Sequence, residues 1–386
     1  MRVAPHVAAL PKSGIRKFFD LVAQSKDTVS LGVGEPDFDT PWHISRAAVT
    51  ALENGGTHYT SNYGTPELRQ AICRYLKRRF RADFDWRTET LVTVGVSEAI
   101  DLVIRAICSP GDEILYHEPC FVSYAPTIRL AHAVPVAVET RVEDAFRLTV
   151  AAMEAKVTPK TRAILLNFPC NPTGATLTSE DMLEILRFAE RHDLLVLADE
   201  VYSELNYGDA ENLWSFASFP AFRDRVVLLN GFSKSWAMTG YRLGYACAPA
   251  DILDQMVKIH QYGIMSAPTL AQAAGVEAMD FGDDDVTRMR EEYRRRRDFL
   301  VPALNALGLK TLLPQGAFYL FTDVRATGLG DEEFALRLLE NHHVAVVPGS
   351  AFGACGAGFV RLSYATSMNK LRLAVERLAG MVGISK

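Results

Sequence analysis

The sequence predicts an α/β protein in which a large domain carries a mainly parallel sheet and a smaller α+β domain accompanies it. From about residue 42, segments with helical periodicity alternate with short apolar runs, which is the pattern of parallel strands joined by helices. These runs are apolar on both faces, as expected where helices cover both sides of a sheet. After about residue 281 the pattern changes to a charged helix followed by strands and helices of α+β type.

Each predicted element rests on a local pattern. In the first part of the chain, apolar runs predict strands over residues 91–94, 113–116, 163–166, 194–198, 226–229 and 243–247. In the second part we expect a helix over 286–307, a strand over 317–321, a helix, strands over 344–347 and 359–363, and a C-terminal helix. One helix is expected near residues 15–24, within an otherwise irregular N-terminal segment.

The composition is that of a globular protein able to bury a sizeable core. Hydrophobic residues make up 48% of the 386 residues and charged residues 23%. The net charge of -5 gives no electrostatic reason to expect nucleic acid or an anionic membrane as a partner, and no apolar run is long enough to span a bilayer. The six cysteines show no CxxC spacing or histidine cluster, so we expect no metal and a reduced, cytoplasmic protein.

The segment over residues 231–244 is the most informative part of the chain. It reads GFSKSWAMTGYRLG and places Lys234 in a loop of small and aromatic residues, with Ser233 beside it and Arg242 further on. An enzyme that holds an aldehyde cofactor through a Schiff base needs such an amine, and a hydroxyl and a guanidinium suit the cofactor's phosphate. A surface lysine in a glycine-rich loop is the alternative for this segment taken alone.

Three further polar or glycine residues lie where predicted strands end. The strand over 91–94 leads into Gly95 and a helix, whose N-terminal N–H groups suit phosphate, although an ordinary strand-to-helix turn has the same pattern. Asn171 lies in a rigid Asn-Pro-Thr-Gly turn, at the edge of the sheet where such folds bind ligands. Asp199 ends an apolar strand, where an acid is costly to bury unless it has a partner such as a protonated pyridine nitrogen.

In these residues and in their order, the chain resembles the class I/II aminotransferases, which use pyridoxal 5'-phosphate (PLP). The resemblance extends from residue 31 to about residue 378. It implies PLP fold type I, with a large domain over residues 42–281 built on a seven-stranded, mainly parallel sheet. The small α+β domain would be formed by residues 1–41 and 282–386 together. The resemblance also implies a homodimer.

The resemblance gives a role to each candidate site residue. Lys234 is implied as the Schiff-base lysine and as the catalytic acid and base, helped by Asp199 at the ring nitrogen and Tyr202 at the phenolic oxygen. Glu200 could be taken for the functional acid, but the family register favours Asp199. The cofactor's remaining contacts are implied for Val96, Ser97, Ser233, Arg242, Phe121, Asn171 and the Tyr59 of the neighbouring subunit, and the substrate contacts for Gly34, Asn171 and Arg361, which would grip the α-carboxylate.

The implied reaction moves an amino group from an L-amino acid to a 2-oxo acid, with 2-oxoglutarate as the expected acceptor, by a ping-pong mechanism. A β-lyase acting on cysteine conjugates and a cyclopropane-forming synthase remain alternatives, because they need the same electron-withdrawing ring. A PLP-sensing regulator is disfavoured because the chain has no basic recognition helix. A nicotinamide dehydrogenase is disfavoured because the glycines near residue 32 lack the third glycine of the dinucleotide fingerprint. The turn after Gly95 offers no cation for a distal carboxylate, which favours a neutral or aromatic donor.

Overall fold

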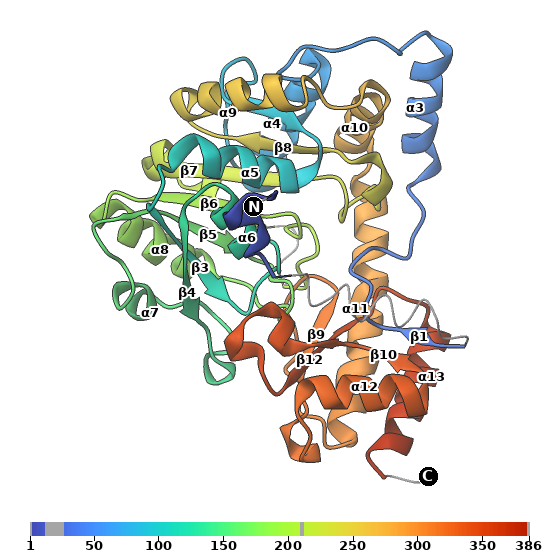
Figure 1. Ribbon diagram of the computed structural model, residues 1–386. Coiled ribbons are helices and arrows are strands. Elements are labelled where there is room, and N and C mark those ends of the chain that lie inside the picture. Colours follow the sequence, from blue (N-terminus) through green and yellow to red (C-terminus); the bar gives the residue numbers. More distant parts are fainter. Residues whose placement is uncertain (1, 12–26, 209–211, 384–386) are drawn as a thin grey trace.

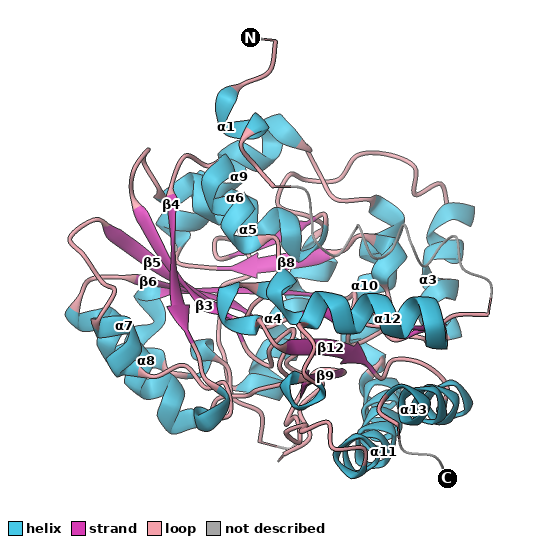
Figure 2. Ribbon diagram, turned by 60° about the horizontal axis from the view of Figure 1, so that its bottom comes forward, coloured by secondary structure: helices cyan, strands magenta, loops and turns pink. Residues whose placement is uncertain are grey.

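A seven-stranded sheet with helices on both faces forms the larger layered unit of the structure (Figures 1 and 2). The computed structural model describes residues 2–11, 27–208 and 212–383, so the helix expected near residues 15–24 lies outside the described residues. The strand order is β2-β8-β7-β6-β5-β3-β4, and only β8 runs antiparallel to its neighbours. The predicted α/β fold with a mainly parallel sheet is therefore confirmed. The strands are β2 (Thr90–Thr93), β3 (Glu113–Glu118), β4 (Val134–Glu139), β5 (Thr161–Asn167), β6 (Leu195–Asp199), β7 (Val226–Gly231) and β8 (Gly244–Cys247).

Successive residues of the central strands are buried on opposite faces of this sheet. In β5, Ile164 and Leu166 belong to one apolar cluster, whereas Ala163 and Leu165 belong to another. The first cluster packs against α7 (Val150–Glu154) and α8 (Ser179–Arg191), and the second against α5 (Gly95–Ile107), α6 (Tyr124–Leu130) and α9 (Ala250–Gly263). Burial on both faces is the reason why these strands read as continuous apolar runs.

A third apolar cluster covers the end of the sheet near β2 and β8. It contains Val92, Leu228 and Tyr245 from the strands, all of them buried. The helices that pack there are α3 (Trp42–Glu53), α4 (Pro66–Phe80) and α10 (Thr269–Phe281). The side chain of Thr65 accepts a hydrogen bond from the Leu68 N–H, and a proline follows it, so the start of α4 is fixed by local sequence.

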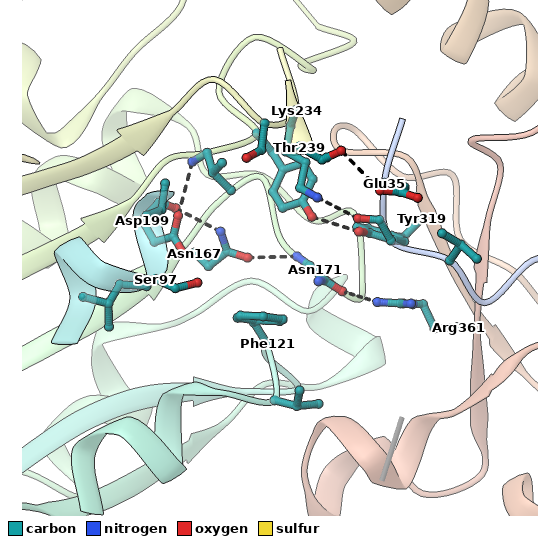
Figure 3. Close-up of a pocket in the computed structure, with 18 of the residues that line it drawn as sticks. Glu35, Ser97, Phe121, Asn167, Asn171, Asp199, Lys234, Thr239, Tyr319 and Arg361 are labelled. Carbon is teal, nitrogen blue, oxygen red and sulfur yellow. Dashed lines mark hydrogen bonds between the residues drawn. The ribbon is translucent and has the colours of Figure 1, made fainter. Parts of the chain in front are cut away.

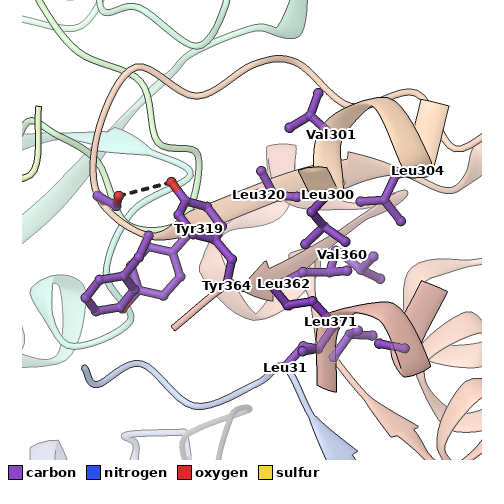
Figure 4. Packing of buried hydrophobic residues seen from close by; sticks show 14 of the residues in the cluster. Leu31, Leu300, Val301, Leu304, Tyr319, Leu320, Val360, Leu362, Tyr364 and Leu371 are labelled. Atoms are coloured by element: carbon purple, nitrogen blue, oxygen red, sulfur yellow. Dashed lines mark hydrogen bonds between the residues drawn. The ribbon is translucent and has the colours of Figure 1, made fainter. Parts of the chain in front are cut away.

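The second unit lies below the first in Figure 1 and is built on a small antiparallel sheet of order β11-β12-β9. Figure 4 shows Leu300 and Leu304 of the long helix facing the apolar side chains of this sheet. All of these residues are almost completely shielded from water, and their cluster also includes Val201, Tyr202 and Leu205 of the first unit. Its elements are α11 (Asp283–Ala306), β9 (Tyr319–Asp323), α12 (Asp331–His342), β10 (Val344–Ala345), β11 (Val347–Pro348), β12 (Phe359–Ser363) and α13 (Met368–Met381).

Two details of the strands differ from the sequence prediction. β4 was not predicted, although its residues are apolar except for Glu139; it contains Pro135, which is tolerated because β4 lies at the edge of the sheet. The single strand predicted over 344–347 is wrong. It is divided into β10, which pairs with β1 (Val29–Ser30), and β11, which pairs with β12.

The N-terminal residues contact both units. β1 pairs in parallel with β10, so residues 29–30 lie against the C-terminal part of the chain. The short helix α1 (Pro5–Ala8) instead lies beside α6, where the rings of His6 and His132 are 4.5 Å apart. The division into domains at residues 41 and 281 stays a prediction.

A buried carboxylate joins the two units. Glu204 is 2% exposed; it accepts hydrogen bonds from the Tyr75 hydroxyl at 2.6 Å and from two nitrogens of Arg79 at 2.8 Å. The Arg290 guanidinium of α11 lies 3.7 Å from the same carboxylate. Buried charges are tolerated only when they are paired, so this cluster fixes α11 against α4.

We predict that Glu204→Ala lowers the free energy of unfolding by about 3–5 kcal/mol, because two guanidinium groups would then lose a buried counter-ion. Urea unfolding followed by fluorescence would measure this change. Glu291→Ala is the matched control. Glu291 pairs with arginines of the same helix, but its side chain is 52% exposed, so its removal should cost at most about 1 kcal/mol. Equal effects of the two changes would contradict the prediction.

Candidate active site

A cavity of about 780 Å³ opens where strands of the large sheet meet the second unit (Figure 3). Its lining includes all of the predicted site residues except Tyr59, which is 83% exposed on the surface of the chain. The lining residues that were predicted are Gly34, Val96, Ser97, Phe121, Asn171, Asp199, Tyr202, Ser233, Lys234, Arg242 and Arg361. The structure thus brings together segments that are far apart in sequence, whereas their individual roles stay predictions.

One end of the cavity is formed by the start of α5. Gly95 has a φ of +75°, a conformation that favours glycine, and a Cβ atom on it would lie 2.7 Å from a terminal nitrogen of Arg242 and displace this guanidinium. Val96 and Ser97 follow in the first turn of the helix, where backbone N–H groups have no partner within the helix. The Arg242 guanidinium also donates to the Thr239 carbonyl at 3.1 Å. Two kinds of anion-binding group therefore face the same place.

The Lys234 amine lies deep in the cavity. Its Nζ donates a hydrogen bond to the Gly34 carbonyl at 2.6 Å. Burial lowers the pKa of this amine from its ordinary value of 10.5 to about 8. The Glu35 carboxylate opposes that shift, and the nearby guanidinium groups add to it. At slightly alkaline pH, a substantial fraction of the amine is therefore unprotonated and able to act as a nucleophile or base.

Asp199 ends β6 and is 4% exposed. Its carboxylate accepts hydrogen bonds from the Tyr124 hydroxyl at 2.6 Å and from the Val201 N–H at 3.3 Å. Burial raises the pKa of Asp199 to about 6, and the Tyr124 hydroxyl works against that increase. Glu200, the other candidate acid, does not line the cavity, because its carboxylate accepts from Ser215 and from the Phe216 N–H instead.

Arg361 lies in the middle of β12 and is 3% exposed. It donates to the Asn171 side-chain oxygen at 2.9 Å and to the Gly32 carbonyl at 2.6 Å. Its guanidinium carbon lies 4.5 Å from the centre of the Tyr319 ring and 4.9 Å from that of Phe352. Burial lowers the pKa of this guanidinium from its ordinary value. Such a rigid, desolvated cation is suited to a carboxylate.

Sequence reasoning missed two tyrosines of the site. Tyr319 lines the cavity, and its hydroxyl lies 2.8 Å from the Tyr202 hydroxyl. The Tyr124 hydroxyl donates a hydrogen bond to the Asp199 carboxylate. Both residues occur in apolar segments where a tyrosine resembles any other core aromatic, so only their partners in space identify them.

The family model described as aminotransferase class I and II matches residues 26–378 of this chain. The chain belongs to the class I/II aminotransferases. It is 45% identical to an aspartate aminotransferase of Pyrococcus abyssi, with 98% of this chain and 97% of the relative covered. It is 43% identical to aromatic-amino-acid aminotransferase 2 of Thermococcus litoralis, with the same shares covered. The crystal structure of an aromatic aminotransferase from Pyrococcus horikoshii OT3 superimposes with a TM-score of 0.90 at 44% identity, covering 96% of this chain and all of that one.

This class I/II aminotransferase is therefore an enzyme of the transferase class, and members of the family use PLP as their cofactor. The cavity fits such a group. The Gly95 turn, which a Cβ atom would fill, faces Arg242 and suits the phosphate, and the Lys234 amine suits the aldehyde. The buried Asp199 carboxylate suits a protonated ring nitrogen, which would offset the cost of its burial.

The described residues can also be compared with the needs of a metal site and of a membrane span. Within residues 2–11, 27–208 and 212–383, no group of three or more histidine, cysteine or acidic side chains could hold a metal ion. Over the same part of the chain, no helix has both the length and the apolar character needed to cross a bilayer.

We predict that the Lys234 amine of the cofactor-free protein reacts with acetic anhydride with a half-maximal rate near pH 8. The reason is that burial favours its neutral, nucleophilic form. Peptide mass spectrometry after brief labelling at a series of pH values would measure the profile. Arg361→Met should move the midpoint upward, because the arginine's charge helps to lower this pKa. A midpoint near the ordinary value of 10.5 in the unchanged protein would contradict the prediction.

Proposed function

We propose that this aminotransferase moves the amino group of an L-amino acid to a 2-oxo acid, with 2-oxoglutarate as the acceptor, in a ping-pong reaction. One observation carries the proposal. A partly buried amine of lowered pKa (Lys234), a buried acid (Asp199) and a buried guanidinium (Arg361) face one cavity. PLP, when bound, supplies the aldehyde that takes the amino group and a ring that withdraws electrons from the substrate's Cα.

Lys234 is proposed to move the proton. Its Nζ has a pKa of about 8 in the cofactor-free protein, so the same nitrogen can accept a proton from carbon and return it near neutral pH. The Gly34 carbonyl, which accepts from Nζ at 2.6 Å, would hold the amine on the substrate side of the cavity. Tyr202 would contribute a hydroxyl close to the reacting atoms, and the Tyr319 hydroxyl would keep it in place.

Arg361 and Asn171 are proposed to orient the substrate. Two terminal nitrogens of the guanidinium can bind a carboxylate as a fork, and the Asn171 oxygen fixes one of them in place. Because that oxygen is occupied by Arg361, the amide nitrogen of Asn171 is the end that remains to donate to the cofactor. The Gly34 backbone lies beside the same guanidinium and would close the substrate's side of the site.

The remaining residues of the cavity are proposed to hold the cofactor. Val96, Ser97, Ser233 and Arg242 surround the end formed by α5 and would bind the phosphate. Phe121, which also lines the cavity, would stack on the ring. Asp199 would keep the ring nitrogen protonated; its carboxylate is oriented for this by the Tyr124 hydroxyl.

We further propose that the active unit is a cytoplasmic homodimer in which Tyr59 reaches the phosphate of the neighbouring site. The side chain of Tyr59 is 83% exposed in the single chain, although it is large and aromatic. The six cysteines are all free thiols, as suits a reducing compartment. Residues 1–41 and 282–386 are proposed as the small domain and 42–281 as the large one, supported by the pairing of β1 with β10.

A half-reaction screen tests the proposed reaction. Purified holoenzyme would receive single L-amino acids, and the cofactor spectrum and the release of ammonia would both be followed. We expect conversion to the amine form of the cofactor without ammonia, and restoration of the starting spectrum by 2-oxoglutarate. Ammonia and pyruvate from cysteine conjugates, with no lasting amine form, would show a β-lyase instead.

The matched control for this screen is Lys234→Ala. It should retain weak binding of the cofactor through the phosphate-binding residues but lose turnover by a factor of about 10²–10⁴, since the general acid–base group is removed. Full activity in this variant would contradict the role proposed for Lys234.

Mixed dimers test the place of Tyr59. Tyr59→Ala and Lys234→Ala subunits would be unfolded and refolded together, and activity would be assayed at limiting PLP. If Tyr59 acts on the neighbouring subunit, a mixed dimer contains one site with both native residues, so activity should recover to about a quarter of the native value in a random mixture, in which half of the dimers are mixed and each has one intact site of two. If Tyr59 acts within its own chain, mixing should restore nothing, and the proposal would fail.

A further inference from the structure

Residues 349–356, here called the 349–356 loop, connect β11 and β12 and extend from the second unit to the large sheet. The loop consists of two short 3₁₀ turns, Gly349–Phe352 and Ala354–Gly356. The function described above gives it no role. Its contacts nevertheless connect two walls of the cavity.

On the side of the large sheet, the loop is bound by the segment that carries Phe121. The Cys120 N–H donates to the Phe352 carbonyl at 3.0 Å. The Glu118 carboxylate accepts from the Ala354 N–H at 3.1 Å and, through its other oxygen, from the Tyr116 hydroxyl at 2.7 Å. Among the residues that the structure describes, the Glu118 carboxylate is thus the only side-chain acceptor of the large sheet that binds the backbone of this loop.

The position of Gly353 shows how closely the loop and this carboxylate fit. Its φ is +128°, a conformation that favours glycine. A Cβ atom on this residue would lie 2.4 Å from both the Cδ and one oxygen of Glu118. The loop therefore approaches Glu118 as closely as a backbone without a side chain allows.

On the side of the second unit, the loop is bound by Asp331. This residue, at the start of α12, is 7% exposed, and its two oxygens accept from the Ser350 N–H at 2.9 Å and the Gly358 N–H at 3.2 Å. Gly358 directly precedes β12, the strand of Arg361. The loop is therefore bound on one side by the Glu118 carboxylate and on the other by the Asp331 carboxylate.

Phe352 connects the loop to the substrate end of the cavity. The residue is 2% exposed, and its ring lies 4.9 Å from the guanidinium carbon of Arg361. Any movement of the loop away from Glu118 would move this ring, which packs directly against the guanidinium. The Glu118 backbone is fixed separately, since its carbonyl accepts from the N–H and the hydroxyl of Thr140 at 2.7 and 2.8 Å.

We propose that Glu118 is a positioning residue for the substrate carboxylate: by binding the 349–356 loop, it fixes Phe352 and, through Phe352, the Arg361 guanidinium. This inference rests on the proposed function only in taking Arg361 as the carboxylate-binding group. Glu118 itself does not line the cavity. Its effect should thus fall on substrate binding and leave the cofactor in place.

The test is carboxylate binding by the holoenzyme of Glu118→Ala. We expect the dissociation constant of 3-phenylpropionate or maleate, whichever the unchanged enzyme binds better, to rise about tenfold in calorimetric titrations, the order expected when a hydrogen bond to a charged group is lost. The KM for the best amino-acid donor should rise by a similar factor, while kcat changes by less than about threefold. The dissociation constant of PLP should stay within about twofold.

Three matched variants separate positioning from a general structural effect. Glu118→Gln keeps an oxygen for the Ala354 N–H and should restore binding to within about threefold. Tyr116→Phe removes the other partner of the carboxylate and should leave binding unchanged. Gly353→Ala should weaken binding as Glu118→Ala does, and the double variant should be weaker by less than the product of the two factors, because the methyl group and the carboxylate compete for one place.

The outcomes are distinct. Unchanged carboxylate binding in Glu118→Ala, or a loss of PLP affinity as large as the loss of carboxylate affinity, would overturn the inference. Failure of the unchanged enzyme to bind either acid would also overturn it, since Arg361 would then not be the carboxylate site. Weakened binding of the acids by an enzyme that transfers no amino group would support the role of Glu118 and reject the proposed function alone.

Discussion

The Lys234 amine is withdrawn from water, and the arrangement around it follows from that constraint. Burial of a cationic amine is costly, so its pKa falls to about 8 and its Nζ takes the Gly34 carbonyl as a partner. Glu35 lies close enough to favour the charged form, whereas Arg361 disfavours it. The segment before α3 that contains Gly34 therefore lies against the cavity and lines part of it.

The topology of the sheet explains why these groups meet. β5, β6 and β7 run in parallel, so the residues that follow them emerge at one edge of the sheet. Asn171, Asp199 and Lys234 all come from that edge, while α5 contributes its N-terminus beside β8. The opposite wall, with Arg361, belongs to an antiparallel sheet whose apolar side chains are divided between two clusters, both shared with the larger unit. The cavity thus has one wall made by strand ends and one made by the middle of a strand.

Much of this could be predicted from the sequence, and the exceptions have physical reasons. Strands buried on both faces, such as β5 and β6, give apolar runs that need no tertiary information. β4 is also an apolar run, but it contains Pro135, and a proline is found in edge strands or outside strands altogether. Tyr319 and Tyr124 escaped notice because what distinguishes them is a hydroxyl partner more than 70 residues away in the chain. The predicted segments of the cavity, in contrast, combine residue types that a core position does not require.

The helix α11 has a mechanical consequence for the whole chain. Its 24 residues, with Pro302 inside the helix, extend over about 36 Å, from a start beside α10 to an end within the core of the second unit (Figure 1). Near its start it is joined to α4 through Glu204. A tilt of about 5° about Arg290 would displace the end of the helix, roughly 24 Å further on, by about 2 Å. Small changes of tilt near Arg290 would therefore be larger at Leu300 and Leu304, which pack in the core of the second unit.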